Sequence, residues 1–263
     1  MVQSPILAQL PSVLSTLLEV ILLSYLLRRK LHRVHPAFCV YIIAVLGQGL
    51  LGALATWHWG VRSQQAWLVY WIAQVVVISA RWLAITEIAR KVFAEYRGIQ
   101  RVLKHLLIFV SACVIVYSFA FSQYRWTRMV LNADRSIELF IATFVVCMFA
   151  FARYYRLPVL NLERQLAIGF CLYSCTWVIN DSIFENKPGA MWELFYYVNV
   201  VAYLASLLLW IGAVRAPVEA RSAPAETQLS PEMYGQLSEQ LNSRLNLLNH
   251  RLGHLFRSGD SQS

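Results

Sequence analysis

Charged residues are scarce in this chain of 263 residues, and that scarcity excludes an ordinary soluble domain. Asp, Glu, Lys and Arg make up 14% of the residues, against 58% for hydrophobic residues. A soluble domain of this length needs far more polar residues to cover its surface. We therefore expect most side chains to face lipid or one another.

Motifs that carry known chemistries are also missing. None of the six histidines lies in the middle of a long apolar stretch, which argues against bis-His haem and His-ligated zinc inside a membrane. The chain contains no Gly-x-Ser-x-Gly elbow, no His-Glu-x-x-His and no Walker A loop. Residues 192–214 hold no Lys that could bind retinal. We name no catalytic residue, metal ligand or cofactor, and the sequence favours a protein that is not an enzyme.

Long apolar stretches are what the chain has in abundance. Seven are long enough to cross a bilayer, because a spanning helix needs about 20 mostly apolar residues. They cover residues 6–27, 38–57, 67–89, 104–123, 136–152, 165–182 and 192–214. The predicted fold class is an all-α polytopic membrane protein, with a seven-transmembrane-helix bundle over residues 1–215. We read the first stretch as a retained helix and not as a cleaved signal peptide.

Lys and Arg in the loops predict the orientation of the bundle. The first, third and fifth loops hold 12 of them, whereas the N-terminus and the other loops hold 5. Cytoplasmic loops carry the excess in membrane proteins. We therefore expect a multi-pass protein of a cell membrane, such as a bacterial inner membrane, with its N-terminus outside and its C-terminus cytoplasmic. The net charge of +9 then suits an anionic inner leaflet, and we do not expect nucleic-acid binding.

The segment after the last span predicts a cytoplasmic tail. Residues 216–229 are rich in Pro, Ser and Ala and predict a flexible linker. Residues 230–257 predict an amphipathic helix, and residues 258–263 a disordered end. The apolar positions of this helix that we expect to mediate oligomerisation are Leu237, Leu241, Leu245, Leu248 and Leu252. The helix could pair as a coiled coil in a homodimer, lie on the inner leaflet, or bind the bundle or a cytoplasmic partner.

Two ionisable residues lie deep in the predicted spans. Glu19 and Arg81 are each eight residues from the inner end of their span, about 12 Å deep at 1.5 Å per residue. Gln48 lies at nearly the same level. Because buried charges usually find a partner, we predict an intramembrane ion pair between Glu19 and Arg81, assisted by Gln48. The alternative is that Arg81 extends to the interface while Glu19 is protonated or faces water.

A second polar group gathers near the outer ends of the last three spans. Acidic residues among aromatic rings at the mouth of a bundle can hold a cationic or polar ligand. The alternative is ordinary polarity at a membrane interface. The predicted ligand-binding residues are Glu138, Trp177, Asn180, Asp181, Glu193, Tyr196 and Asn199.

Small residues recur in the second span. Gly49 and Ala53 are four residues apart, with Gly47 and Gly52 beside them. Small residues at this spacing let helices approach closely. We expect this span to be tightly packed within the bundle or at a dimer seam.

The stretch from Arg81 to Arg101 carries a resemblance. Its sequence, RWLAITEIARKVFAEYRGIQR, resembles the third span and following loop of a family of uncharacterised bacterial seven-helix membrane proteins. The resemblance implies the same seven-span topology. That family has no assigned activity, so the resemblance implies no function.

The features together favour an integral membrane sensor. A small or lipidic ligand would bind among the helices, and the signal would pass to the cytoplasmic tail. Two alternatives remain open at this stage. A transporter or channel would need a water-accessible path past Glu19, Gln48 and Arg81, and a scaffold would act through the tail alone.

Overall fold

The protein is described here as a computed structural model covering residues 5–60, 63–94, 97–121, 126–154, 159–186 and 192–216. Within these ranges, side chains are described except for residues 5–10, 97–99, 181–186 and 192–195. The predicted tail, including the helix 230–257 and its leucines, lies outside the described residues. No strand occurs within the described ranges, where the regular structure is helical throughout.

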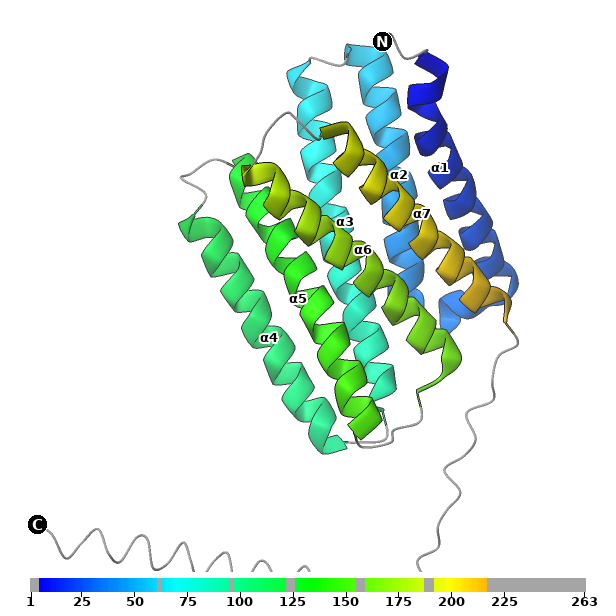
Figure 1. The fold of residues 1–263 in the computed structure, drawn as a ribbon, viewed down its shortest axis with the longest axis vertical. Coiled ribbons are helices and arrows are strands. Elements are labelled where there is room, and N and C mark those ends of the chain that lie inside the picture. Colours follow the sequence, from blue (N-terminus) through cyan, green and yellow to red (C-terminus); the bar gives the residue numbers. More distant parts are fainter. Residues whose placement is uncertain are drawn as a thin grey trace, which may run out of the picture. The chain divides into compact units, whose positions relative to one another are not determined.

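Seven α-helices follow one another along the described residues (Figure 1). Their bounds are α1 Pro5–Arg28, α2 Pro36–Trp59, α3 Gln64–Val92, α4 Arg97–Ala120, α5 Trp126–Tyr154, α6 Asn161–Asn186 and α7 Trp192–Arg215. A short 3₁₀ helix, η1 Leu31–Arg33, joins α1 to α2. Among the described residues, six of the α-helices contain a stretch long and apolar enough to cross a membrane, and the described part of α6 does not. The protein is therefore an all-helical, multi-pass membrane protein.

Local sequence signals fix several helix ends. Pro36 stands in the first turn of α2, where its missing N–H costs nothing and its fixed φ suits a helix. Gly60, with φ of 85°, ends α2 in a conformation that a side chain would strain. The Ser63 side chain caps α3 by accepting a hydrogen bond from the Ala66 N–H at 3.1 Å.

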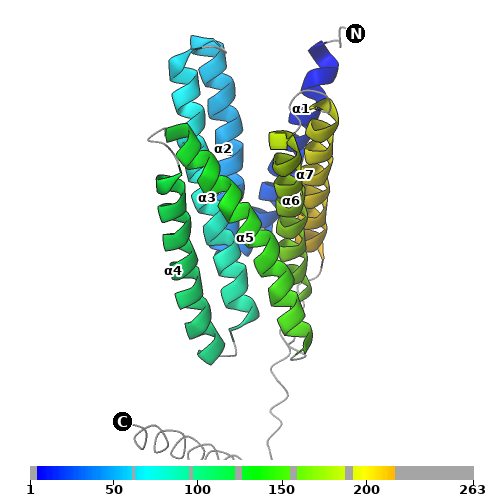
Figure 2. The ribbon, with the colours of Figure 1, turned by 60° about the vertical axis from the view of Figure 1, so that its left-hand side comes forward.

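The helices pack side by side, with α4 at the edge. α1 contacts α2 and α7, α2 packs along α3, and α5 lies between α4 and α6. α3 also contacts α5 and α6. In Figure 2, the α2–α3 pair and the α1–α7 pair diverge toward the end at which the N-terminus lies. We call this the N-terminal end and the other the η1 end, because η1 lies there.

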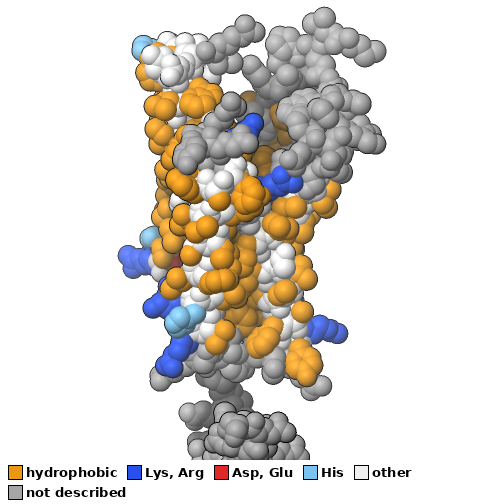
Figure 3. Space-filling model, turned by 90° about the vertical axis from the view of Figure 1, so that its left-hand side faces the viewer, with side chains coloured by type: hydrophobic (Ala, Val, Ile, Leu, Met, Phe, Trp, Pro, Cys, Tyr) orange, Lys and Arg blue, Asp and Glu red, His pale blue; other side chains and the backbone are white. Residues whose placement is uncertain are grey.

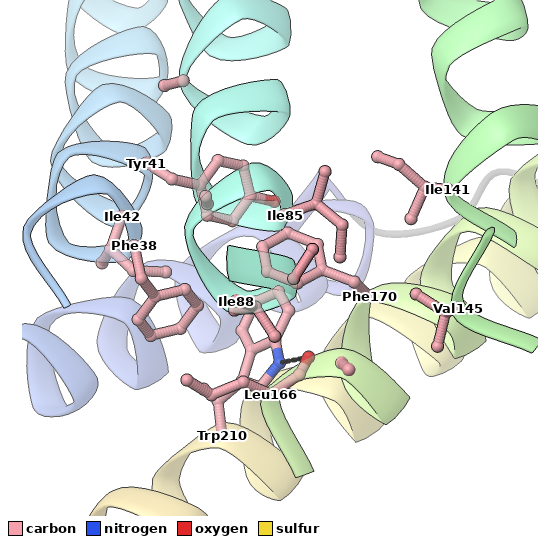
Figure 4. Packing of buried hydrophobic residues seen from close by; sticks show 14 of the residues in the cluster. Phe38, Tyr41, Ile42, Ile85, Ile88, Ile141, Val145, Leu166, Phe170 and Trp210 are labelled. Carbon is pink, nitrogen blue, oxygen red and sulfur yellow. Dashed lines mark hydrogen bonds between the residues drawn. The ribbon is translucent and has the colours of Figure 1, made fainter. Parts of the chain in front are cut away.

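A buried aromatic cluster fills the bundle toward the η1 end. It consists of Phe38, Tyr41, Phe170 and Trp210 (Figure 4). The Phe170 and Trp210 rings lie 4.9 Å apart, and the Trp210 indole N–H donates to the Leu166 carbonyl at 3.0 Å. The indole sits directly over Gly169, where an added Cβ would lie 2.2 Å from Trp210 Nε1. Aromatic burial on this scale closes the space between α2, α6 and α7.

The outer surface suits lipid. Figure 3 shows hydrophobic side chains covering the face that includes α4, with most of the visible Lys and Arg in the lower half, toward the η1 end. Exposed hydrophobic residues on this and neighbouring helices include Ile108, Val116, Leu139 and Val146. In water such a surface would be an extensive apolar patch, whereas in a bilayer it is the expected exterior.

The connection between α1 and α2 is held against α3 at the η1 end. The Glu87 carboxylate accepts hydrogen bonds from the backbone N–H groups of Ala37 at 3.0 Å and Phe38 at 3.2 Å. One turn further along α3, the Lys91 ammonium donates to the Val34 carbonyl. Free N–H groups at a helix start attract a carboxylate. Glu87 therefore acts as a cap for α2 that is supplied by α3.

Candidate functional site: a polar cavity among the helices

A cavity of about 540 Å³ lies between the helices, from the middle of the bundle toward the N-terminal end. Side chains from α1, α2, α3, α5, α6 and α7 line it, so α4 alone takes no part. Its volume falls within the range of about 300–1,000 Å³ that is usual for small-molecule sites. The aromatic cluster lies below it, and Tyr41 belongs to both.

α1 turns one polar stripe toward the cavity. Ser12, Ser15, Thr16 and Glu19 all line it. They are spaced at i, i+3, i+4 and i+7, which places them on one face of a helix. The opposite face is apolar and exposed, with Leu17 and Val20 among its members. This is the reverse of a soluble amphipathic helix, as expected when lipid lies outside and polar groups lie within.

α2 leaves space open where close packing was expected. Gly49, Gly52 and Ala53 line the cavity. A Cβ added at Gly49 or Gly52 would have no heavy atom within 4 Å. The small residues at these positions thus enlarge the cavity. The same helix packs along α3, as expected for a span packed within the bundle, and the alternative of a dimer seam stays a prediction.

Arg81 is paired with two carboxylates of α5. Its Nη1 lies 3.2 Å from Asp134 Oδ1 and also donates to Glu138 Oε1. Asp134 and Glu138 are one helical turn apart, so both carboxylates face the same guanidinium. All three residues are at most 4% exposed. The second Glu138 oxygen accepts a hydrogen bond from Ser174 of α6. Three helices thus meet at one buried charge cluster.

A chain of amide groups extends this cluster across the cavity. Gln74 Nε2 donates to Asp134 Oδ2 at 3.0 Å. Gln48 Nε2 in turn donates to Gln74 Oε1 at 2.6 Å. Both oxygens of Asp134 are therefore filled by protein donors. Within the cluster, the Arg81 Nε–H is buried without a hydrogen-bond partner.

Glu19 is held separately from Arg81. Its Oε1 accepts a hydrogen bond from the Tyr203 hydroxyl at 2.7 Å, and the side chain is 5% exposed. The Tyr203 ring lies 5.5 Å from the Tyr173 ring, and the Arg81 guanidinium lies over that ring at 5.2 Å. Arg81 thus takes the α5 carboxylates in place of the expected partner Glu19. The expectation rested on equal depth, but depth does not specify which helix faces which.

The predicted ion-pair residues and the predicted ligand residues lie closer together than the sequence suggested. Glu19, Gln48, Arg81 and Trp177 line the same cavity. Glu138 is fully buried in the charge cluster and does not lie at an open mouth.

Of the other predicted ligand residues, three described ones do not line the cavity: Asn180, Tyr196 and Asn199. Asn180 and Asn199 are half-buried, each with a side-chain oxygen that lacks a hydrogen-bond partner. Tyr196 is 44% exposed. The side chains of Asp181 and Glu193 lie outside the described residues.

Gln74, Ser174 and the tyrosines of the cavity wall were not predicted as site residues from the sequence. Two signals could have found some of them. The polar spacing on α1 is one, and the seven-residue interval between Gln74 and Arg81 on α3 is another. The tyrosines carry no such signal, because an aromatic residue in a span suits packing as well as a binding site.

A second cavity, of about 420 Å³, lies between α3, α4 and α5 and is almost entirely apolar. Its polar side chains are three serines. Ser79 and Ser111 donate to backbone carbonyls within their own helices. No charged group lines this cavity, so the first cavity is the candidate functional site.

The fold and this site define a class, a multi-pass helical membrane protein with a charged cavity among its helices. Comparison of the chain with protein-family models, with curated proteins and with solved structures finds no match.

Proposed function

We propose that the protein is an integral membrane sensor that binds a small ligand in the polar cavity. The observation that carries the proposal is the cavity itself, which six helices line with carboxylates, amides and tyrosines. Empty space with convergent polar groups is what a binding site needs. The signal would pass through α3 to the η1 end and to the tail beyond residue 216.

The proposal includes a topology of seven spans. α5 and α7 run in the same direction in Figure 1, which supports a crossing by α6 between them. The polar residues Glu163, Arg164 and Gln165 at the start of α6 and Asn180 toward its end lower the hydropathy of its described part. The exposed Arg28, Arg90 and Arg153 gather at the η1 end, which supports a cytoplasmic location for that end.

A transporter is the alternative that uses the same cavity. It requires the cavity to open in turn toward the η1 end, where the aromatic cluster fills the space between the helices. The filled half of the bundle therefore favours a sensor over a carrier. A scaffold acting through the residues 230–257 would make no use of the cavity.

The test is native mass spectrometry of the protein released from lipid nanodiscs. We expect a reproducible adduct that is not a lipid and that supplies the mass of the ligand. The variant Gly52→Leu should abolish the adduct, because its side chain enters the cavity. The matched control is Gly47→Leu on the same helix, where a Cβ also meets nothing within 4 Å but which does not line the cavity. An adduct that persists in Gly52→Leu would contradict the proposal.

A further inference from the structure

The charges around the cavity are unequal, and the imbalance specifies the chemistry of the ligand. Glu19, Asp134 and Arg81 are the charged residues that line the cavity, and Glu138 contacts Arg81 from behind. The cavity and its margin thus hold three carboxylates and one guanidinium. Buried charges without partners are costly. A cationic ligand at the carboxylates would restore the balance.

The three carboxylates differ in how many of their oxygens remain without a hydrogen bond from the protein. Asp134 and Glu138 each use both oxygens for protein donors, namely Arg81, Gln74 and Ser174. Glu19 receives one hydrogen bond, from Tyr203 to Oε1. Among the residues that the structure describes, none donates to its Oε2, while the side chain lines the cavity and is 5% exposed. Glu19 is therefore the carboxylate that remains available to a ligand.

Arg81 does not repel a cation at this place. Two carboxylates offset its charge, and two aromatic rings cover it, Tyr173 at 5.2 Å and Tyr41 at 5.8 Å from the guanidinium carbon. Its contact with Glu19 is indirect: Arg81 packs on the Tyr173 ring, which contacts Tyr203, the hydrogen-bond donor to Glu19. The Glu19 side of the cavity therefore carries net negative charge.

The walls near Glu19 suit an organic cation better than a metal ion. Tyr41, Tyr173, Trp177 and Tyr203 line the cavity, with Tyr173 and Trp177 stacked at 6.1 Å. Aromatic faces attract ammonium groups, and the attraction grows where water is excluded. No group of three or more His, Cys, Asp or Glu suited to a metal occurs in the described part of the chain. A volume of about 540 Å³ also exceeds what a bare ion fills.

We infer that the ligand of this cavity is a small organic ammonium compound whose cationic nitrogen binds Glu19 among the tyrosines. The inference rests on the proposed function and specifies its ligand class. Gly49 and Gly52 set the size of the ligand, because any larger residue there would occupy the space opposite Glu19's helix. Ser12, Ser15 and Thr16 supply polar groups toward the N-terminal end.

The experiment measures the thermal unfolding midpoint of the full chain in nanodiscs with a series of probes at constant chloride. The probes are tetramethylammonium and choline, primary alkylammonium ions from ethyl to butyl, the neutral alcohols of matching length, the matching carboxylates, and sodium alone. Neutral alcohols and carboxylates test the competing reading, in which the ligand is an acceptor for the Arg81 Nε–H.

We expect at least one ammonium probe to raise the midpoint of the wild type with a saturating concentration dependence, and the alcohols and carboxylates to leave it unchanged. Glu19→Gln should weaken that probe about tenfold to a hundredfold, the range typical of a lost charged hydrogen bond. Glutamine keeps an acceptor for Tyr203, so this variant retains the local packing. Gly52→Leu should abolish the effect, and the control Gly47→Leu should keep it.

Each other outcome overturns the inference in a distinct way. Ammonium binding that is equal in wild type and Glu19→Gln removes Glu19 as the anchor. Stabilisation by alcohols, carboxylates or sodium in place of the ammonium probes removes the charge assignment. No response to any probe also overturns the ammonium assignment. In all these cases, a native adduct that Gly52→Leu abolishes still supports the proposed function, so the two can fail separately.

Discussion

Gly52 and Gly169 lie in two halves of one bundle, and a methyl group added to each would meet opposite surroundings. At Gly52, in the polar cavity, it would have no heavy atom within 4 Å. At Gly169, under the aromatic cluster, it would lie 2.2 Å from Trp210 Nε1. The same residue type thus marks open space in one half and the closest packing in the other. Protein interiors are normally close-packed, so the open half indicates a site that something else fills.

The largest effect that would test this contrast is expected at the charge cluster under the cavity. Arg81→Met leaves Asp134 and Glu138 buried without their cation. We expect the free energy of unfolding to fall by about 3–5 kcal/mol. Adding Glu138→Gln to Arg81→Met should recover part of the loss, because it removes one of the stranded charges. Thermal unfolding in detergent measures both, and an equal loss in the single and double variants would contradict the pairing.

The next effect concerns the η1 end, where the titratable side chain of His35 is buried. Burial and the nearby charge of Lys91 lower the pKa of His35 from 6.5 to about 4. His35 is 3% exposed, and its Nδ1 has no hydrogen-bond partner. The folded protein therefore keeps His35 neutral where the unfolded chain would bind a proton. The neutral His35 therefore contributes to the free energy of unfolding above pH 6.5. This contribution, at most about 3 kcal/mol, is lost as the pH falls toward 4.

The variant His35→Leu tests this assignment. It should flatten the dependence of the unfolding midpoint on pH between 6.5 and 4, while acidic groups still contribute near the lower limit. The measurement is a series of thermal unfolding curves across that range. A wild type and variant with parallel pH profiles would show that another group is responsible.

The glycine under the aromatic cluster should give a smaller loss. In Gly169→Ala, the new methyl group displaces the Trp210 indole, which donates to the Leu166 carbonyl. Overpacking of this kind costs about 1–3 kcal/mol. Intrinsic tryptophan fluorescence during chemical unfolding measures the change. Unchanged stability would show that the indole moves aside freely and that this half is not closely packed.

The smallest effect has the opposite sign and belongs to the cavity. Gly52→Ala should stabilise the protein by about 0.5–1 kcal/mol, because alanine favours the helix and meets no neighbour. Gly47→Ala should give a similar gain outside the cavity. The two variants should differ only in ligand binding, which Gly52→Ala weakens. A loss of stability in Gly52→Ala would show that the new methyl group meets a neighbour, and would contradict open space at this position.

The sequence predicts the helices well because hydropathy follows lipid exposure directly. Each of the seven predicted stretches coincides with a helix. The fifth was predicted from residue 136, whereas α5 begins at Trp126. Asp134 and Glu138 look like an interface in the sequence, but in the structure they are buried against Arg81. Buried ion pairs thus hide the start of a span from any count of apolar residues.

The candidate site is less predictable. The depth of a residue in the membrane does not determine how each helix is rotated about its axis, and so does not determine which side chains meet. The sequence singles out Glu19, Gln48, Arg81 and Trp177, and all four line the cavity. Their partners were not found. Pairing by depth joined Arg81 to Glu19, while the contacts of α3 with α5 decide the matter in favour of Asp134 and Glu138.

The cap that Glu87 gives to α2 has a mechanical consequence. Arg81 and Glu87 are six residues apart on α3, about 9 Å along its axis. Glu87 accepts hydrogen bonds from the first N–H groups of α2, and Lys91 donates one to the backbone that leads into α2. α3 and the start of α2 are therefore tied together at the η1 end. A rotation of α3 that begins at the charge cluster would therefore also move the connection that contains η1.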